Sequence, residues 1–178
     1  MTQPTTIPDA AAAPQEYIRS LLDLLGERDP LTVMEELPGW VESRVRGVDD
    51  ATLRRPEAPG KWSAIEVVQH LADVEVIYRY RTGVILERDG APIVGYDQDI
   101  WAREGHYRDV RLETALAQLR VMRAANLALW RSLTPAQLAR AGMHSERGRE
   151  SLPQTLRLLG GHDLVHRRQL DRILAAVR

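Results

Sequence analysis

Apolar residues recur every three or four positions along most of this 178-residue chain, and no stretch shows sustained alternation of apolar and polar residues. The first spacing is that of an α-helix with one buried face, whereas alternation would indicate a half-buried strand. The sequence therefore predicts an all-α protein. A chain of this length can bury one proper core and is short for two.

Capping residues and helix breakers divide this pattern into separate helices. A first helix over residues 15–25 is expected to end at Gly26. A second begins at Asp29-Pro30, which places aspartate at the N-cap and proline in the first turn. Because a proline inside a helix costs about 3 kcal/mol, Pro38 is expected to start a new helical segment at or near Gly39.

Longer helices follow, each with its own start signal. Residues 63–66 and 151–154 have the spacing of a capping box, and the helices they open run to about residue 88 and to near the C-terminus. Asp109 is a candidate cap for a further helix that ends near residue 132. Four long helices joined by connections predict an antiparallel bundle over residues 15–178, preceded by a flexible arm over residues 1–14. The remaining connections are predicted as loops over residues 49–61, 90–109 and 140–150.

Charge and composition exclude several classes of function. The formal net charge of −1 argues against the dense basic face that binds nucleic acid. No run of 18 apolar residues is present, so no membrane span is predicted. Residues 1–14 lack the basic and apolar regions of a secretory signal, and a cytoplasmic location is expected by elimination.

Cysteine is absent from the chain. This excludes disulfides, a thiolate nucleophile and any cysteine-ligated zinc site. A bound metal must therefore be held by nitrogen and oxygen ligands. Any thiol chemistry requires a thiol that arrives on a small molecule.

Three histidines occupy positions where the helical pattern expects apolar side chains. Two imidazoles one helical turn apart can converge on one cation, and a third facing the interior would bury its nitrogens at a cost unless they are partnered. A shared divalent metal satisfies all three; the alternative is half-buried histidines bonded to backbone groups or water. His70 shares a stripe with Val67, Val74 and Ile77, and the final helix has the inward positions Leu156, Leu159, His162, His166, Leu170, Ile173 and Val177.

Other polar residues and a glycine pair are weaker candidates. Asp73, one turn after His70, is either a carboxylate that orients an imidazole or a helix-surface group. Asn126 faces inward and either bonds a ligand or is a satisfied buried amide. The 90–109 connection offers Tyr96, Asp97 and Asp99 as substrate contacts or as loop caps, and its length is typical of functional or mobile loops.

A glycine pair and the two other histidines can each be explained by structure alone. Gly160-Gly161 costs about 1 kcal/mol per glycine inside a helix, which indicates that a neighbouring helix or a ligand approaches the backbone there. His106 and His144 lie in predicted loops and are expected at the surface.

Several short motifs resemble one family when they are taken in order. These are Gly60-Lys61-Trp62-Ser63, His70-Leu71-Ala72-Asp73, Gly161-His162-Asp163 with His166, the 92–101 loop and His144-Ser145-Glu146-Arg147-Gly148. The chain from about Gln15 onward resembles the DinB-like, YfiT-related four-helix-bundle proteins.

The resemblance implies an up-down-down-up bundle, often dimeric, with a divalent metal on one histidine of the second helix and two of the last. Those positions are His70, His162 and His166 here, and zinc or nickel is the expected ion. Relatives catalyse thiol-dependent S-transfer with bacillithiol or mycothiol, or metal-dependent hydrolysis.

Two classes of function follow. The first expectation is an enzyme that transfers a low-molecular-weight thiol to an electrophilic small-molecule substrate, with hydrolysis second, because three protein ligands leave coordination positions open. The alternative is a non-catalytic protein in which the metal joins two helices and adds to folding stability. A homodimer is expected, without nucleic-acid or membrane partners.

Overall fold

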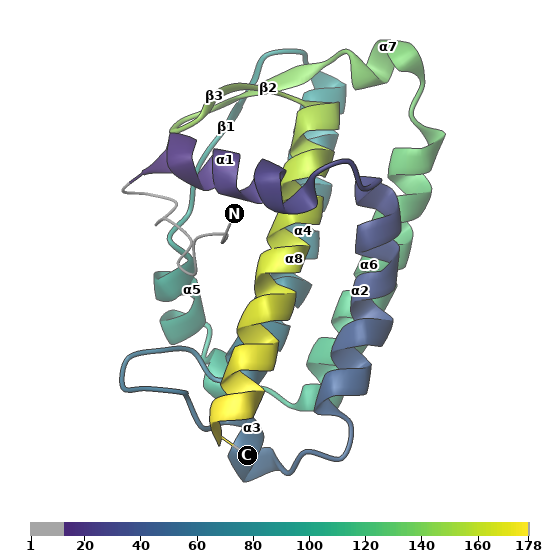
Figure 1. Ribbon diagram of the computed structural model, residues 1–178. Coiled ribbons are helices and arrows are strands. Elements are labelled where there is room, and N and C mark those ends of the chain that lie inside the picture. The colour runs from purple at the N-terminus through teal and green to yellow at the C-terminus, as the bar shows by residue number, and fades with distance from the viewer. Residues whose placement is uncertain (1–12, 178) are drawn as a thin grey trace.

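The computed structural model describes residues 13–177, and four long helices form its body (Figure 1). Helices α2 and α8 run in one direction and α4 and α6 in the other, so the chain order is up-down-down-up, as the resemblance implied (Figure 1). The predicted bundle is therefore confirmed. Residues 1–12 of the predicted N-terminal arm lie outside the described residues. The four helices are α2 Pro30–Val45, α4 Ala64–Glu87, α6 Leu112–Ser132 and α8 Leu152–Val177.

Shorter elements cover the ends and one side of the bundle. Helix α1, Pro14–Leu25, lies across α8, and the segment that returns from the end of α4 to the start of α6 runs along the bundle (Figure 1). None of the described helices combines the length and the apolar character needed to cross a lipid bilayer. The other short helices are α3 Asp50–Leu53, α5 Gln98–Glu104, η1 Tyr107–Asp109 and α7 Pro135–Leu138.

A small three-stranded sheet replaces parts of two predicted loops. Strand β1, Ala91–Ile93, pairs in parallel with β2, Ala141–His144, and β2 pairs antiparallel with β3, Gly148–Ser151. Strands of three or four residues are too short to show a period of two in the sequence, which is why they were not predicted. The sheet closes the end of the bundle at which α4 ends and α8 begins (Figure 1).

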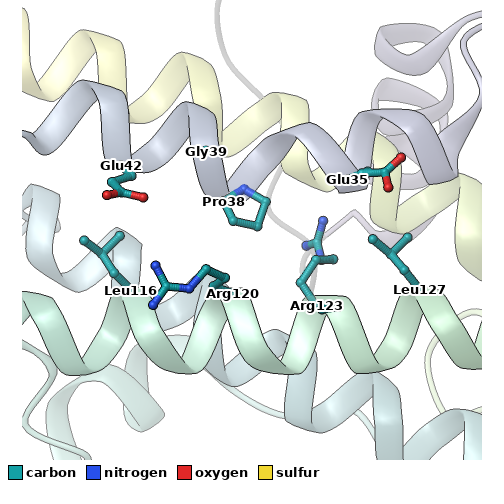
Figure 2. Close-up of a pocket in the computed structure, with 9 residues that line it drawn as sticks. Glu35, Pro38, Gly39, Glu42, Leu116, Arg120, Arg123 and Leu127 are labelled. Atoms are coloured by element: carbon teal, nitrogen blue, oxygen red, sulfur yellow. The ribbon is translucent and has the colours of Figure 1, made fainter.

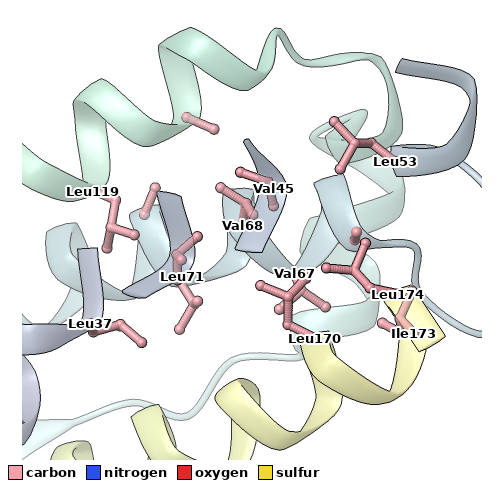
Figure 3. Packing of buried hydrophobic residues seen from close by; sticks show 14 residues of the cluster. Leu37, Val45, Leu53, Val67, Val68, Leu71, Leu119, Leu170, Ile173 and Leu174 are labelled. Atoms are coloured by element: carbon pink, nitrogen blue, oxygen red, sulfur yellow. The ribbon is translucent and has the colours of Figure 1, made fainter. Parts of the chain in front are cut away.

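Two apolar clusters fill the bundle, one toward each end. The first contains Leu37, Leu71, Leu119 and Leu170 (Figure 3). The second contains Met34, Val74, Leu127 and Leu159. Each long helix passes from one cluster to the other. The buried polar side chains gather close to the level at which the two clusters meet.

The expected break at Pro38 is wrong, because α2 continues through this residue to Val45. A proline has no N–H, so the carbonyl of Met34, four residues earlier, loses its usual helical donor. The guanidinium of Arg123 supplies a substitute, with Nη1 2.6 Å from the Met34 carbonyl oxygen. The cost of the proline is thus offset by a contact between helices that no local pattern reveals.

The helix start signals were partly correct. The 63–66 capping box is present in full at the start of α4. Arg111, not Asp109, is the N-cap of α6, because Asp109 belongs to the short helix η1. At the start of α8 the Ser151 hydroxyl accepts from the Gln154 N–H at 3.3 Å.

The glycine pair of α8 is explained by the close approach of α1. A Cβ on Gly161 would lie 2.3 Å from the carbonyl oxygen of Leu21, and one on Gly160 would lie 3.1 Å from Pro30. The neighbouring-helix interpretation is therefore the correct one. Gly161 lets α1 rest directly on α8, one residue before His162.

A Gly161→Ala variant is expected to lose about 1–3 kcal/mol of unfolding free energy, because the methyl group must push α1 away. Gly83→Ala is the matched control, since a Cβ at this helical position meets nothing within 4 Å. That change should stabilise the protein by up to about 1 kcal/mol. Thermal denaturation measures the melting temperature of both variants, and equal changes in the two would contradict the close packing of α1 on Gly161.

Candidate metal centre

Three imidazole rings meet inside the bundle, where His70 lies next to Leu71 of the first apolar cluster. His70 projects from α4, and His162 and His166 project from consecutive turns of α8. The Nε2 atom of His162 lies 3.2 Å from that of His70 and 3.1 Å from that of His166. All three residues are buried, with exposed fractions of 2%, 8% and 6% for His70, His162 and His166. One ligand atom from each lies within 4.8 Å of the other two.

The spacing of these nitrogens fits a single ion. Two nitrogens bound tetrahedrally at about 2.0–2.1 Å from zinc are about 3.3 Å from each other. Hydrogen bonds alone do not satisfy the three rings, because one ring nitrogen carries either a proton or a lone pair. The Nε2 atom of His162 faces two other imidazole nitrogens and can form a hydrogen bond with only one of them. A shared cation accepts all three lone pairs.

The environment keeps the imidazoles of His70 and His166 neutral, which is the form that binds a metal. Burial, with a smaller contribution from the neighbouring His162, lowers the pKa of His166 to about 3. Burial also holds the pKa of His70 well below its usual value, with His166 and His162 adding to the effect. Protons therefore do not compete for these two rings near neutral pH.

Neighbouring side chains fix the orientation of two of the rings. The Nδ1–H of His166 donates to Oε1 of Gln169 at 2.7 Å, which leaves the lone pair on Nε2. Such a partner sets the tautomer of a metal-binding histidine. The indole of Trp62 packs against His70, with ring centroids 5.0 Å apart. Sequence reasoning noted Trp62 only as part of a motif, and it did not single out Gln169.

A buried network of charges joins α4, α6 and α8 beside the histidines. Arg123 of α6 donates to both carboxylate oxygens of Asp163, at 2.6 and 3.2 Å, and pairs with Glu75 at 2.7 Å. These three side chains are at most 1% exposed. Burial raises the pKa of Asp163, but the charge and hydrogen bonding of Arg123 together with the neighbouring His162 outweigh this and hold that pKa below its usual value. Burial raises the pKa of Glu75, against the opposing effect of Arg123.

Sequence reasoning missed Arg123, Glu75 and Asp163 as interior residues. Arg123 lies four residues from both Leu119 and Leu127, so the helical stripe held the signal. A charged residue at one such position is usually assigned to the surface, and only the facing helices show that opposite charges meet. The amide of Asn126 is buried and only partly satisfied: its Nδ2 donates to Glu75 Oε2 at 2.9 Å, whereas its Oδ1 has no partner among the described residues.

A pocket of about 270 Å³ opens between α2 and α6 on the other side of this network. Arg123 reaches from α6 toward α2 at its wall, and Pro38 and Glu35 line the opposite side (Figure 2). None of the three histidines lines it. This pocket is therefore separate from the candidate metal centre.

Asp73 orients the returning segment and does not bond an imidazole. Its Oδ2 accepts from the hydroxyl of Tyr107 at 2.5 Å, and its Oδ1 accepts from Gln69 and Gln118 at 3.0 and 2.8 Å. The two roles considered from sequence, an imidazole partner and a helix-surface carboxylate, are both replaced by this one. Asp73 thereby holds η1 against α4, one turn from His70.

Each of the remaining sequence candidates either has a structural role or is exposed. Asp97 is the N-cap of α5, since its carboxylate accepts from the N–H groups of Asp99 and Ile100. Tyr96 is partly buried and its ring packs on Trp101, with centroids 4.8 Å apart. His106 is exposed, as expected.

His144 corrects a second expectation. It was predicted at the surface, yet it is only 4% exposed. The loop in which it was expected is the β2–β3 hairpin, and strand pairing directs this side chain toward the interior.

Comparison with known proteins adds a family and a fold. The model of the DinB superfamily matches residues 34–170. A protein of Geobacillus thermodenitrificans named "Putative metal-dependent hydrolase" is 29% identical over 110 residues, which is 62% of this chain and 62% of that protein. YfiT of Bacillus subtilis, named in the same way, is 28% identical over 116 residues, or 65% of each chain.

One solved structure shares the architecture. It is described as YfiT from Bacillus subtilis, "a probable metal-dependent hydrolase with an unusual four-helix bundle topology". It superposes with a TM-score of 0.72 at 24% identity and covers 97% of this chain and 92% of its own. At 24% identity, this likeness shows that the two proteins share a fold.

Proposed function

This chain belongs to the DinB superfamily, and from that premise we propose that it is a metal-dependent enzyme that hydrolyses a small-molecule substrate. The observation that carries the proposal is the convergence of His70, His162 and His166 on one point. The hydrolase names of the relatives favour this reaction class over others. Since the matched segment spans 62% of the Geobacillus relative, the activity is proposed for this chain from its own site.

The donor set suits a borderline divalent ion. Three imidazole nitrogens without a thiolate are typical ligands for zinc or nickel, and we propose one of these as the resident metal. Within residues 13–177 the ligand group has three members, which leaves coordination positions for exchangeable molecules. The metal would supply Lewis acidity that makes water, or a thiol, nucleophilic near neutral pH.

The protein's own residues position this chemistry. Gln169 directs the lone pair of His166 toward the centre, and the ion pair of Asp163 with Arg123 fixes α8 one residue after His162. Asp73 already accepts three hydrogen bonds, so we assign it to positioning and not to proton transfer. Trp62 packs against the ring of His70, with centroids 5.0 Å apart, which is consistent with a partly dry site.

The second candidate is thiol transfer to an electrophile. It is favoured by the absence of cysteine, since a cysteine-free chain can take part in thiol chemistry only with an external thiol. The two reactions differ in one requirement, which makes them separable. Hydrolysis needs only water, whereas S-transfer needs a low-molecular-weight thiol as a second substrate.

We expect metal-loaded protein to turn over activated esters and amides at rates that do not change when a low-molecular-weight thiol is added. Product formation with and without thiol, followed by mass spectrometry, checks this. The matched control is His166→Ala, which removes a proposed ligand and should remove turnover. Turnover that appears only with thiol, and that yields a thioether, would replace hydrolysis by S-transfer. Stoichiometric metal without any turnover would favour the non-catalytic role.

A further inference from the structure

A second group of polar side chains gathers where the β2–β3 hairpin meets α4, and we call it the hairpin cluster. Electrostatic interactions link the charges of its basic residues to the hydroxyls of its tyrosines and to one carboxylate. It is separate from the candidate metal centre. Its members are Tyr17 of α1, Tyr78 and Arg81 of α4, Tyr96 of the returning segment, and His144, Arg147 and Glu150 of the hairpin.

Two buried donors in the hairpin cluster are unsatisfied. The Nδ1 atom of His144 accepts from the backbone N–H of Glu146 at 3.2 Å, so the proton of the neutral ring lies on Nε2. Among the described residues, neither His144 Nε2 nor Arg147 Nη2 has a hydrogen-bond partner, although both atoms are buried. A buried donor without an acceptor costs about 1–3 kcal/mol. Both groups therefore require an acceptor from outside the chain.

The charges of the hairpin cluster point to the kind of acceptor. Arg81 and Arg147 are both cationic. Glu150 already pairs with Arg147, because Oε2 accepts from Arg147 Nε at 2.8 Å and Oε1 accepts from the Thr155 hydroxyl at 3.0 Å. The carboxylate of Glu146, on the same hairpin, lies against Gly95. Within the described part of the chain Arg81 forms no ion pair with a carboxylate and donates to the Val94 carbonyl, so its charge can pair with one anionic group.

The arginine that faces the hairpin is held in place. Nη2 of Arg81 donates to the Val94 carbonyl at 2.9 Å, and its guanidinium lies 5.5 Å from the centroid of the Tyr78 ring and 5.7 Å from that of Tyr96. The cation is thus fixed before any ligand arrives. Preorganisation of this kind lowers the cost of binding.

The hairpin cluster lies on the same helix face as the candidate metal centre. Residues 70, 74, 78 and 81 are spaced by four, four and three positions, so His70, Val74, Tyr78 and Arg81 share one stripe of α4. At about 1.5 Å per residue, the eleven residues from His70 to Arg81 span about 16 Å. Tyr96 lies beside Arg81, whose guanidinium is 5.7 Å from the centroid of its ring.

We propose that the hairpin cluster binds one anionic group, a carboxylate or a phosphate, through Arg147, His144 and Arg81. Resting on the proposed function, we further infer that this group is one end of an elongated small-molecule substrate whose other end reacts at the histidines. The spacing of His70 and Arg81 along α4 sets the length of that substrate at about 16 Å between the two ends. The anion site itself does not depend on the metal.

Titration calorimetry with inorganic phosphate and with succinate, at constant ionic strength set by chloride, tests the site. We expect saturable binding of at least one of them to the full-length protein, and the tighter of the two identifies the anion class. Arg147→Gln should weaken binding by at least about ten-fold, the loss expected for one charge-assisted hydrogen bond. Arg149→Gln is the matched control, because Arg149 lies on the same hairpin with an exposed side chain and a loose 3.7 Å contact to Asp89. It should leave binding within about two-fold of wild type.

A further variant separates a lost site from a misfolded protein. His144→Leu leaves the Arg147–Glu150 pair intact, and it should weaken binding while circular dichroism stays unchanged. Metal content should stay at the wild-type level in this variant, and His166→Ala should still bind the anion. If the wild-type protein bound no metal, that result would therefore contradict the proposed function and leave the anion site unaffected. Absence of saturable binding of either anion to wild type, or equal losses in the Arg147 and Arg149 variants, would overturn the anion site.

Discussion

Replacing Arg123 by methionine is expected to destabilise the protein by about 3–5 kcal/mol, the usual cost of removing one partner from a buried ion pair. Asp163 and Glu75 would be left facing each other without a cation, at 0% exposure each. The Met34 carbonyl, which has no N–H donor from Pro38, would lose its contact as well. For a chain of this size the loss corresponds to a fall of about 6–20 °C in melting temperature.

Arg131→Met is the matched control for this change. Arg131 lies on the same helix and pairs with Glu35 at 2.8 Å, but both side chains are exposed and water screens the pair. We expect its melting temperature to stay close to that of wild type. Scanning calorimetry compares the two variants directly. If Arg123→Met and Arg131→Met had the same melting temperature, the charge network would not be the structural connection between α2, α6 and α8.

Removal of the metal is the second large effect that we expect. A ligand present at about 1,000 times its Kd stabilises the folded state by about 4 kcal/mol, and a chelator should abolish that contribution. His166→Ala should melt at one temperature with or without metal, because two imidazoles remain and Gln169 no longer orients a third. Calorimetry with added zinc, added nickel and chelator measures the difference.

His106→Ala is the control for the histidine variant. His106 is exposed and lies outside the three-histidine group, so its substitution should preserve the full metal-dependent shift. A shift that survives in His166→Ala but is lost in His106→Ala would mean that the metal binds elsewhere. Loss of the shift in both would point to a general defect in folding.

Helical periodicity was sufficient to predict the bundle and the convergence of its histidines. The inward stripe of α8 was read correctly from Leu156 to Val177, and every member of it is buried. Periodicity reports which face of a helix is inside, so three polar residues on inward faces could be identified without knowing the neighbours. The distance between His70 and His162 needs the packing of α4 on α8, which the sequence does not show.

The errors arise where long-range contacts outweigh local preference. Pro38 would end an isolated helix, but Arg123, 85 positions further along, supplies the missing donor. The strands around His144 are short, and pairing with residues about 50 positions away creates them. Arg123 and Asp163 were missed for a related reason, since a buried charge is tolerable only when its partner is present. These partners come from different helices.

X-ray absorption at the metal edge of the loaded protein reports directly on the ligands of the proposed ion. We expect three imidazole nitrogens at about 2.0–2.1 Å from a single zinc or nickel ion, together with lighter ligands that exchange with solvent. A first shell with one imidazole or none, at full metal occupancy, would contradict the assignment of His70, His162 and His166.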